Sequence, residues 1–260
     1  MIIHLTKRLY PSNNIPHICN YVSRGENILK EIITKNYTNK DFPFYKNNPR
    51  ISKKGWIILF ISIFIGFIVS DLFYGFSQII GSFLMLIVMI IPLLYYSKWD
   101  YSILMEKPNK DEIKLAILMF IFYLVYAAVM SFILGSLNLI GPDSGPADLV
   151  MTWDLYASLI FAMMSEELIK FIPLMFFMKL FYKYSENKKV SFILSSLIVL
   201  VGFGILHFSD SVTIYSVLLL QGLGSIFELY GYFKTKNLFV PYLSHLLTDG
   251  FLMGLMFLPH

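Results

Sequence analysis

The chain alternates long apolar stretches with short polar connections. A helix needs about 20 mainly apolar residues to cross roughly 30 Å of hydrocarbon. Stretches of this length lie near residues 55–76, 78–97, 113–137, 153–182, 190–208, 212–233 and 238–258. The pattern predicts an all-α fold, a polytopic transmembrane helical bundle of about seven spans, over residues 55–260. The segment Gly141–Asp148, rich in Gly, Pro and Asp, is expected to be its clearest loop.

The composition excludes an ordinary soluble globular protein, because 57% of the residues are hydrophobic and only 15% are charged. Residues 1–54 hold ten Lys or Arg and three acidic residues, whereas the net charge of the whole chain is +4. Such a cluster before a first span is typical of cytoplasmic retention and of contact with anionic lipid. Residues 1–54 are therefore expected to be a basic, partly disordered, cytoplasmic juxtamembrane arm. No nucleic-acid module accompanies them, so no nucleic-acid partner is expected.

The connections between the spans fall into two groups, one with basic residues and one without, as expected for the two sides of a membrane. Lys and Arg occur in 98–114, 179–189 and 234–236, but not in 71–78, 138–150 and 209–212. By the positive-inside rule, the amino terminus is expected in the cytoplasm and the carboxyl terminus outside. Cys19 is the one cysteine of the chain, which excludes an internal disulfide framework and a thiolate metal cluster.

The fourth predicted span carries two adjacent carboxylates, Glu166 and Glu167, and a lysine, Lys170. A charge at the bilayer centre costs roughly 2.5 to 3.5 kcal/mol on insertion scales, so these residues are expected to have partners or a function. Lys170 follows the two glutamates at spacings that allow contact on one helix face. Because the glutamates point about 100° apart, one can face a cavity while the other pairs with Lys170. A structural ion pair between helices would account for the same residues equally well.

Two of the histidines lie in later spans. Phe203 and His207 are one turn apart in the fifth span, and His245 and Asp249 are one turn apart in the last. Alone, either pair could be a hydrogen-bonding contact between helices. Measured from the predicted span ends, Glu166 and Asp249 fall near the midplane, His207 toward the outer face and His245 toward the inner one. Tilt, kinking or a shortened fifth helix is expected to reconcile these depths.

The remaining polar and small residues of the sixth span are expected to serve structure. Glu228 is expected to approach the cytoplasmic end and pair with Lys234, and Gln221 is given no chemical role. Gly222, Gly224 and Ser225 are expected to permit close helix packing.

Three motifs together carry a family resemblance. They are E-E-x-x-K at Glu166–Lys170, F-x-x-x-H at Phe203–His207 and H-x-x-x-D at His245–Asp249. This set resembles the CPBP family of CAAX proteases and bacteriocin-processing enzymes, also called the Abi family. The approach to the last motif, G-L-G-S-I-F-E-L-Y-G-Y-F-K-T-K-N-L-F-V-P-Y-L-S-H, is similar to the family's as well. The resemblance covers about residues 110–258 and leaves out the arm.

The chain departs from the family pattern at two positions. Phe171 stands where members commonly have an arginine, and Asp249 stands where the final motif often ends in Asn. The first and third motifs are similar to those of PrsW-type intramembrane proteases, whose middle motif ends in a glutamate in place of His207. The histidine and the approach sequence favour CPBP.

The resemblance implies an intramembrane endopeptidase that acts on prenylated, leader-type or other membrane-associated peptides. Glu166 would be the general base for a water molecule, and His207 would share or orient that water. His245 would stabilise the oxyanion. Asp249 takes the position of a second oxyanion donor. Since an ionised aspartate cannot donate, it is expected either to be protonated or to orient His245.

The other motif residues are expected to support this chemistry. Glu167 would hold the geometry of the site through Lys170 or a backbone donor, and Phe203 is a further supporting residue. The implied partners are a peptide or lipopeptide substrate and the lipid bilayer, with anionic lipid at the arm.

Other functions fit the same residues. Glu166, His207, His245 and Asp249 are all acceptable zinc ligands, so a zinc-dependent protease is the main alternative. The chain has no H-E-x-x-H motif, and metal-free catalysis is the preferred interpretation, with no cofactor expected. A non-catalytic bacteriocin-immunity or scaffold protein would not need Glu166. A proton-coupled transporter would use such residues in a relay, but it predicts repeated broken helices, and the sequence shows no repeat.

Overall fold

A computed structural model describes residues 15–46, 48–140, 152–208 and 213–257, with side chains from residue 25 onward. The chain divides into two compact units, Met1–Tyr37 and Thr38–His260. Within the described residues every regular element is helical and none is a strand, which confirms the all-α prediction. The expected loop Gly141–Asp148 lies outside the described residues.

The first unit contains helix α2 (Ile15–Thr34). This helix lies in the arm that the charge pattern predicts to be partly disordered. Just after the helix, the Tyr37 hydroxyl donates a hydrogen bond to the carbonyl oxygen of Ile32, at 2.9 Å.

Residues 38–52 belong to the second unit, although the charge pattern placed them in the arm. Phe42, Phe44 and Tyr45 are buried in the core of this unit. The ring of Phe42 stacks on that of Phe192, with 5.0 Å between their centroids. The compact units divide between residues 37 and 38. Charge alone could not show this, because burial of the interspersed aromatic rings decides where the segment packs.

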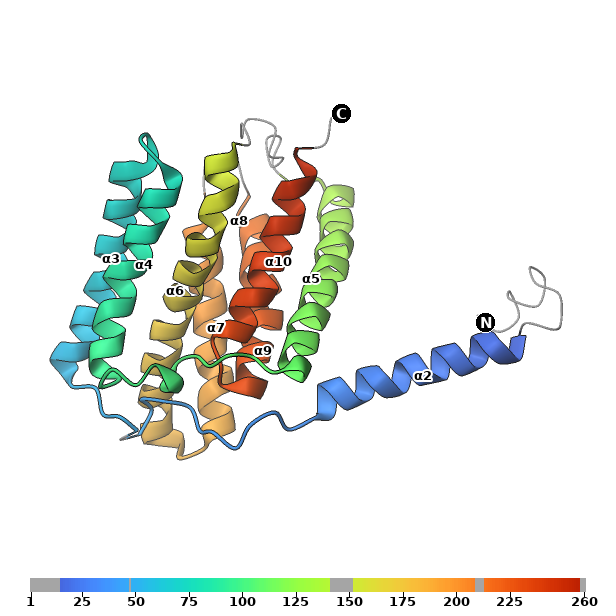
Figure 1. The fold of residues 1–260 in the computed structure, drawn as a ribbon, viewed down its shortest axis with the longest axis horizontal. Coiled ribbons are helices and arrows are strands. Elements are labelled where there is room, and N and C mark those ends of the chain that lie inside the picture. The colour runs from blue at the N-terminus through green and yellow to red at the C-terminus, as the bar shows by residue number, and fades with distance from the viewer. Residues whose placement is uncertain (1–14, 47, 141–151, 209–212, 258–260) are drawn as a thin grey trace. The chain divides into compact units, whose positions relative to one another are not determined.

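The second unit is a helical bundle (Figure 1). Its long helices are α3 (Lys53–Tyr74), α4 (Gln78–Tyr96), α5 (Lys110–Ser136), α6 (Trp153–Ser185), α7 (Lys188–Leu206), α9 (Ile226–Thr235) and α10 (Phe239–Leu255). Short elements are η1 (Tyr101–Ile103), α8 (Ile214–Ser216), the π-helical η3 (Val217–Gly222) and the 3-10 turn η4 (Leu223–Ser225). α3 packs on α4, α4 on α6 and α6 on α7, while α10 contacts α5, α6 and α9.

The predicted spans coincide with these helices. Five segments of the described chain are long and apolar enough to cross a membrane: α3, α4, α5, α7 and residues 214–235. α6 is longer than any of these but carries charged residues at its centre, and α10 has 17 residues. The protein is an integral, multi-pass membrane protein, and about seven spans agree with the observed helices.

Close contact between α7 and η3 depends on two glycines. A Cβ atom on Gly204 would lie 2.7 Å from the carbonyl oxygen of Val217, and one on Gly222 would lie 2.7 Å from that of Leu200. A Cβ on Gly224 would meet the ring of Tyr123 at 2.7 Å. This confirms the packing role predicted for Gly222 and Gly224, and it holds α7 against the segment that leads to α9.

Polar contacts fix the ends of the helices that carry the site. At the start of α6, the Asp154 carboxylate accepts hydrogen bonds from the Ser77 hydroxyl at 3.0 Å and from the Gln78 amide at 2.6 Å. Before α10, the Asn237 side chain accepts from the Glu106 amide and donates to the Glu106 carbonyl, both at 3.0 Å. Because these bonds satisfy backbone groups at helix ends, they set where α4, α6 and α10 begin.

Candidate active site

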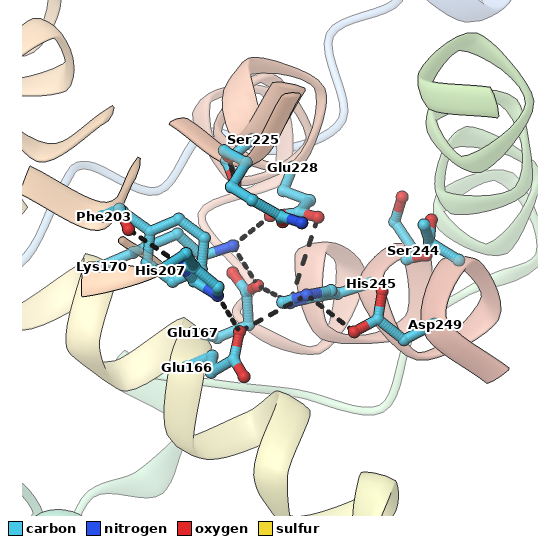
Figure 2. A network of polar contacts seen from close by, with 12 residues as sticks. Glu166, Glu167, Lys170, Phe203, His207, Ser225, Glu228, Ser244, His245 and Asp249 are labelled. Carbon is cyan, nitrogen blue, oxygen red and sulfur yellow. Dashed lines mark hydrogen bonds and ion pairs between the residues drawn. The ribbon is translucent and has the colours of Figure 1, made fainter. Parts of the chain in front are cut away.

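The three sequence motifs meet in one cluster of side chains (Figure 2). α6 contributes Glu166, Glu167 and Lys170, α7 contributes Phe203 with His207 at its carboxyl-terminal cap, and α10 contributes His245 and Asp249. α9 adds Glu228, which lies beside Lys170. Every candidate site residue named from the sequence is therefore in this cluster.

A buried ion pair network forms the base of the cluster. The Lys170 ammonium lies 2.6 Å from Glu167 Oε1 and also bonds the Glu228 carboxylate. It lies 4.6 Å from the centroid of the Phe203 ring. Lys170, Glu167 and Glu228 are all buried. Because two carboxylates surround one ammonium, this group of three carries an excess of negative charge next to His245.

His245 connects the network to the other polar side chains. Its Nδ1 atom lies 2.8 Å from Glu167 Oε1, a distance typical of a charge-assisted hydrogen bond. A carboxylate can only accept, so the hydrogen is on Nδ1 of His245. The opposite nitrogen, Nε2, lies 3.7 Å from Glu166 Oε2 and 3.7 Å from Asp249 Oδ2. The ring is thus fixed in orientation by Glu167, and its Nε2 faces Glu166 and Asp249.

His207 is fixed in a similar way by the backbone. Its Nδ1 atom lies 2.9 Å from the carbonyl oxygen of Phe203, and the two rings are 4.7 Å apart in an edge arrangement. Since a carbonyl oxygen only accepts, Nδ1 of His207 carries a hydrogen. In the neutral ring Nε2 is then an acceptor, and it lies 4.0 Å from Glu166 Oε2.

Glu166 differs from its neighbour Glu167 in exposure. The Glu166 side chain is 26% exposed and that of Glu167 is 3% exposed. Glu166, His207, His245 and Asp249 line one cavity of about 370 Å³, which α4 and α6 also border. The sequence-based expectation that one glutamate faces a cavity while the other contacts Lys170 matches this arrangement.

The structure reconciles the depths of His207 and Glu166. Judged from the apolar stretch alone, His207 falls toward the outer face, and a shortened fifth helix is one of the ways by which it could reach Glu166. α7 ends at Leu206 beside the middle of the longer α6, so His207 caps a helix that stops within the bundle. The short helix therefore brings His207 to the level of Glu166, with 4.0 Å between Nε2 and Oε2.

The expected partner of Glu228 is also wrong. Glu228 bonds Lys170 and not Lys234, and its Oε1 atom lies 4.0 Å from Nδ1 of His245. The position of an acid inside an apolar span signals that it needs a partner. The position of Glu228 toward the cytoplasmic end of its span suggested Lys234, whereas the contact between α6 and α9 decides the pairing.

One group of three possible metal ligands is already occupied by a lysine. Ligand atoms of Glu167, Glu228 and His245 lie within 4.8 Å of one another. The Lys170 ammonium contacts both of these carboxylates. A divalent cation there would have to displace a positive charge from its hydrogen bonds, so this group does not suit a metal ion.

The comparison with known families agrees with the position of the cluster. Residues 148–251 match the model of the family described as Rce1-like, type II CAAX prenyl endopeptidase. That stretch contains the residues of the cluster from all four helices, Glu166 to Asp249. Neither a curated protein nor a solved structure matches the chain. The matched region, residues 148–251, is of the CPBP type, and it points to a membrane protease, a hydrolase.

Proposed function

We propose that this protein is an intramembrane endopeptidase that uses Glu166 and His207 to activate water, without a metal ion. The observation that carries the proposal is the grouping of three atoms around one cavity. Glu166 Oε2 lies 4.0 Å from His207 Nε2 and 3.7 Å from His245 Nε2. Glu166 Oε2 and His207 Nε2 are acceptors suited to water, and His245 Nε2 is placed to face the carbonyl of a substrate.

The first step would be activation of a water molecule. Glu166 Oε2 and His207 Nε2 are 4.0 Å apart, and one water at about 2.8 Å from each could donate a hydrogen bond to both. The Phe203 carbonyl keeps the hydrogen of His207 on Nδ1, so Nε2 stays an acceptor. Glu166 would take the proton as the water oxygen attacks the peptide carbonyl, and would return it to the leaving amine.

His245 would stabilise the oxyanion that forms in this attack. To donate from Nε2 while Nδ1 donates to Glu167, the ring must carry both hydrogens and a positive charge. The excess negative charge of Glu167 and Glu228 over Lys170 favours that state. Asp249, 3.7 Å from Nε2, would supply a second donor in its protonated form. Its alternative role of orienting His245 is already filled by Glu167.

The matched family and the bilayer support a proposed substrate class. A family described as a CAAX prenyl endopeptidase makes a prenylated carboxyl-terminal peptide the first substrate to test. A leader peptide or bacteriocin precursor would be the second. In either case the bilayer would concentrate the peptide beside the cavity, and we propose that the amino terminus of the protease lies in the cytoplasm.

Zinc is the alternative that a specific feature supports. Both histidines have Nδ1 hydrogen-bonded and Nε2 directed toward Glu166, which is the usual state of zinc-ligating imidazoles. With bonds near 2 Å, tetrahedral ligands lie roughly 3.3 Å apart, closer than the 3.7 and 4.0 Å seen here. If bound, zinc would be held by Glu166, His207, His245 and Asp249 and would lower the pKa of a bound water.

The proposal can be tested on purified protein in detergent with a library of prenylated and unmodified peptides. We expect cleavage by the wild type, loss of cleavage in Glu166→Gln and His245→Ala, and no effect of a zinc chelator. Loss of wild-type cleavage with chelator and recovery with zinc would overturn the metal-free mechanism. Folded protein that cleaves no peptide, and whose cellular effect survives Glu166→Gln, would instead support a non-catalytic scaffold.

A further inference from the structure

An apolar groove lies between α3 and the last turns of α6. It encloses about 450 Å³ and shares no residue with the cavity around Glu166. Its lining consists of five apolar side chains, Trp56, Ile57, Phe60, Phe176 and Leu180, and three lysines, Lys53, Lys179 and Lys183. Its residues belong to the start of α3 and the end of α6. Both helix ends lie at the same end of the bundle (Figure 1), the one that the charge distribution places in the cytoplasm.

The apolar wall of the groove is built from interlocking aromatic rings. Phe176 meets Trp56 edge-on at 5.4 Å between centroids and Phe60 at 5.2 Å. Ile57, in the next position on α3, is 58% exposed. Such a wall is rigid and open to hydrocarbon along one side, which suits an extended acyl chain.

The three lysines have no carboxylate partner in the part of the chain that the structure describes. None of the residues that line the groove is acidic. The Lys179 ammonium donates one hydrogen bond, to the Ile51 carbonyl at 2.9 Å, and lies 5.7 Å from the Trp56 ring. Two of its three hydrogens are left for another acceptor. The groove thus combines an apolar wall with uncompensated positive charge.

Two further features of the groove favour an anion. α3 begins with Lys53 and Lys54, which places two cations at the positive end of the helix dipole, where a negative group is favoured. The indole nitrogen of Trp56 is a buried donor with no acceptor among the described residues. The oxygens of a lipid headgroup match both features. A phosphate would supply the negative group favoured at the start of α3, and a phosphate or ester oxygen would be an acceptor for the indole nitrogen of Trp56.

We propose that this groove binds an anionic glycerophospholipid. Its phosphate would lie near Lys53, Lys179 and Lys183, and an acyl chain would lie along the aromatic wall. A zwitterionic lipid would leave the three positive charges uncompensated, and free phosphate would make no use of the wall. The site is separate from the peptide cavity, and its test does not depend on any cleavage activity.

Fluorescence of Trp56 can report on the groove directly. In a Trp99→Phe/Trp153→Phe background Trp56 is the only tryptophan, and the two replaced residues are exposed. The protein would be placed in vesicles with phosphatidylglycerol or phosphatidylcholine whose acyl chains carry bromine, a quencher at short range. We expect that half-maximal quenching of Trp56 needs about tenfold less brominated phosphatidylglycerol than brominated phosphatidylcholine.

Charge variants separate the groove from general surface attraction. Lys53→Gln/Lys183→Gln should remove the preference for phosphatidylglycerol. Lys107→Gln/Lys110→Gln removes the same charge from two exposed lysines at the same end of the bundle and should keep the preference. Circular dichroism would establish that both variants are folded. Equal quenching by the two lipids, or equal loss in both lysine pairs, would overturn the proposal.

Other occupants give different results in the same assay. Relief of quenching by inorganic phosphate alone would indicate an anion site without the acyl chain and would overturn the lipid assignment. A prenylated peptide that relieves the quenching equally in both lipids would place the isoprenyl chain of a substrate in the groove. That result would also overturn the lipid assignment.

Discussion

At the residue scale, two glutamates that are adjacent in sequence have different surroundings. Glu166 faces the cavity, and Glu167 is buried between Lys170 and His245. The 100° turn between neighbouring helix positions predicts that they separate, but not which histidine each one meets. That assignment depends on how α7 and α10 approach α6, and periodicity along one helix carries no information about it.

The buried Lys170 network should be important for stability. Replacing Lys170 with Met would leave Glu167 and Glu228 buried without their cation, which typically costs about 3 to 5 kcal/mol. The matched control is Lys114→Met. Lys114 pairs with Asp111 at the same i,i+3 spacing but on the surface, where a pair contributes below about 1 kcal/mol. Unfolding in detergent should show a large loss for the first variant only. Equal stability of the two variants would contradict a stabilising role of the ion pairs of Lys170.

Asp249 should act as a hydrogen-bond donor. Asn at this position can donate without being protonated, so Asp249→Asn should keep cleavage within about tenfold of the wild type. Asp249→Ala removes the donor and should lose roughly 10² to 10³ in rate. The measurement is single-turnover cleavage with the same peptide. If Asn is as damaging as Ala, the carboxylate itself is needed and the donor role is wrong.

At the element scale, the sequence predicted where the helices lie better than how they meet. Long apolar stretches are sufficient to place α3 to α10, because hydrocarbon imposes helix and length together. The sequence left open whether tilt, a kink or a short fifth helix brings His207 to Glu166, and the end of α7 at Leu206 shows that the helix is short. The charge pattern gave no sign of the packing of residues 38–52, because it does not register the buried aromatic rings among their basic residues.

The contact between α7 and η3 should set the position of His207. Gly204→Ala would bring a Cβ to 2.7 Å from the Val217 carbonyl, and such overpacking typically costs about 1 to 3 kcal/mol. Gly202→Ala, on the same helix, meets nothing within 4 Å and should be tolerated. We expect lower stability and lower cleavage for Gly204→Ala only. Equal behaviour of the two variants would contradict the close contact.

The segment before α3 should be held to α7 by Asp41. Burial raises the pKa of this carboxyl, but bonds from Lys188, Tyr45 and the Phe42 amide outweigh it and hold the pKa below its ordinary value. Their distances are 2.8, 2.7 and 2.9 Å. A lowered carboxyl pKa adds stability above the unfolded value, about 3.9, and this stability is lost as pH falls through the folded value.

Asp41→Asn should therefore be less stable than the wild type at pH 6, and the difference should shrink as the pH falls below about 4. Melting temperatures measured across this range test the expectation. Asp71→Asn, at the exposed end of α3, is the control for the loss of a surface carboxylate. A difference between wild type and Asp41→Asn that does not change with pH would contradict the ionic role of Asp41.

At the scale of the whole molecule, seven spans would place the two ends of the chain on opposite sides of the membrane. Cys19, in the arm, should react with an impermeant maleimide only in inverted vesicles. A Cys19→Ser/Ser136→Cys protein moves the cysteine to the exposed end of α5 and should react only from the outside. Labelling of both positions from the same side would contradict the predicted orientation.

The central claim is that Glu166 is the base for hydrolysis, and the direct test is the single-turnover rate of Glu166→Gln. Gln keeps the shape of the side chain but cannot take a proton, so the rate should fall by roughly 10² to 10⁴ while the melting temperature is kept. Glu106→Gln, at an exposed acid, should cleave like the wild type. A folded Glu166→Gln protein that cleaves within tenfold of the wild-type rate would contradict the account.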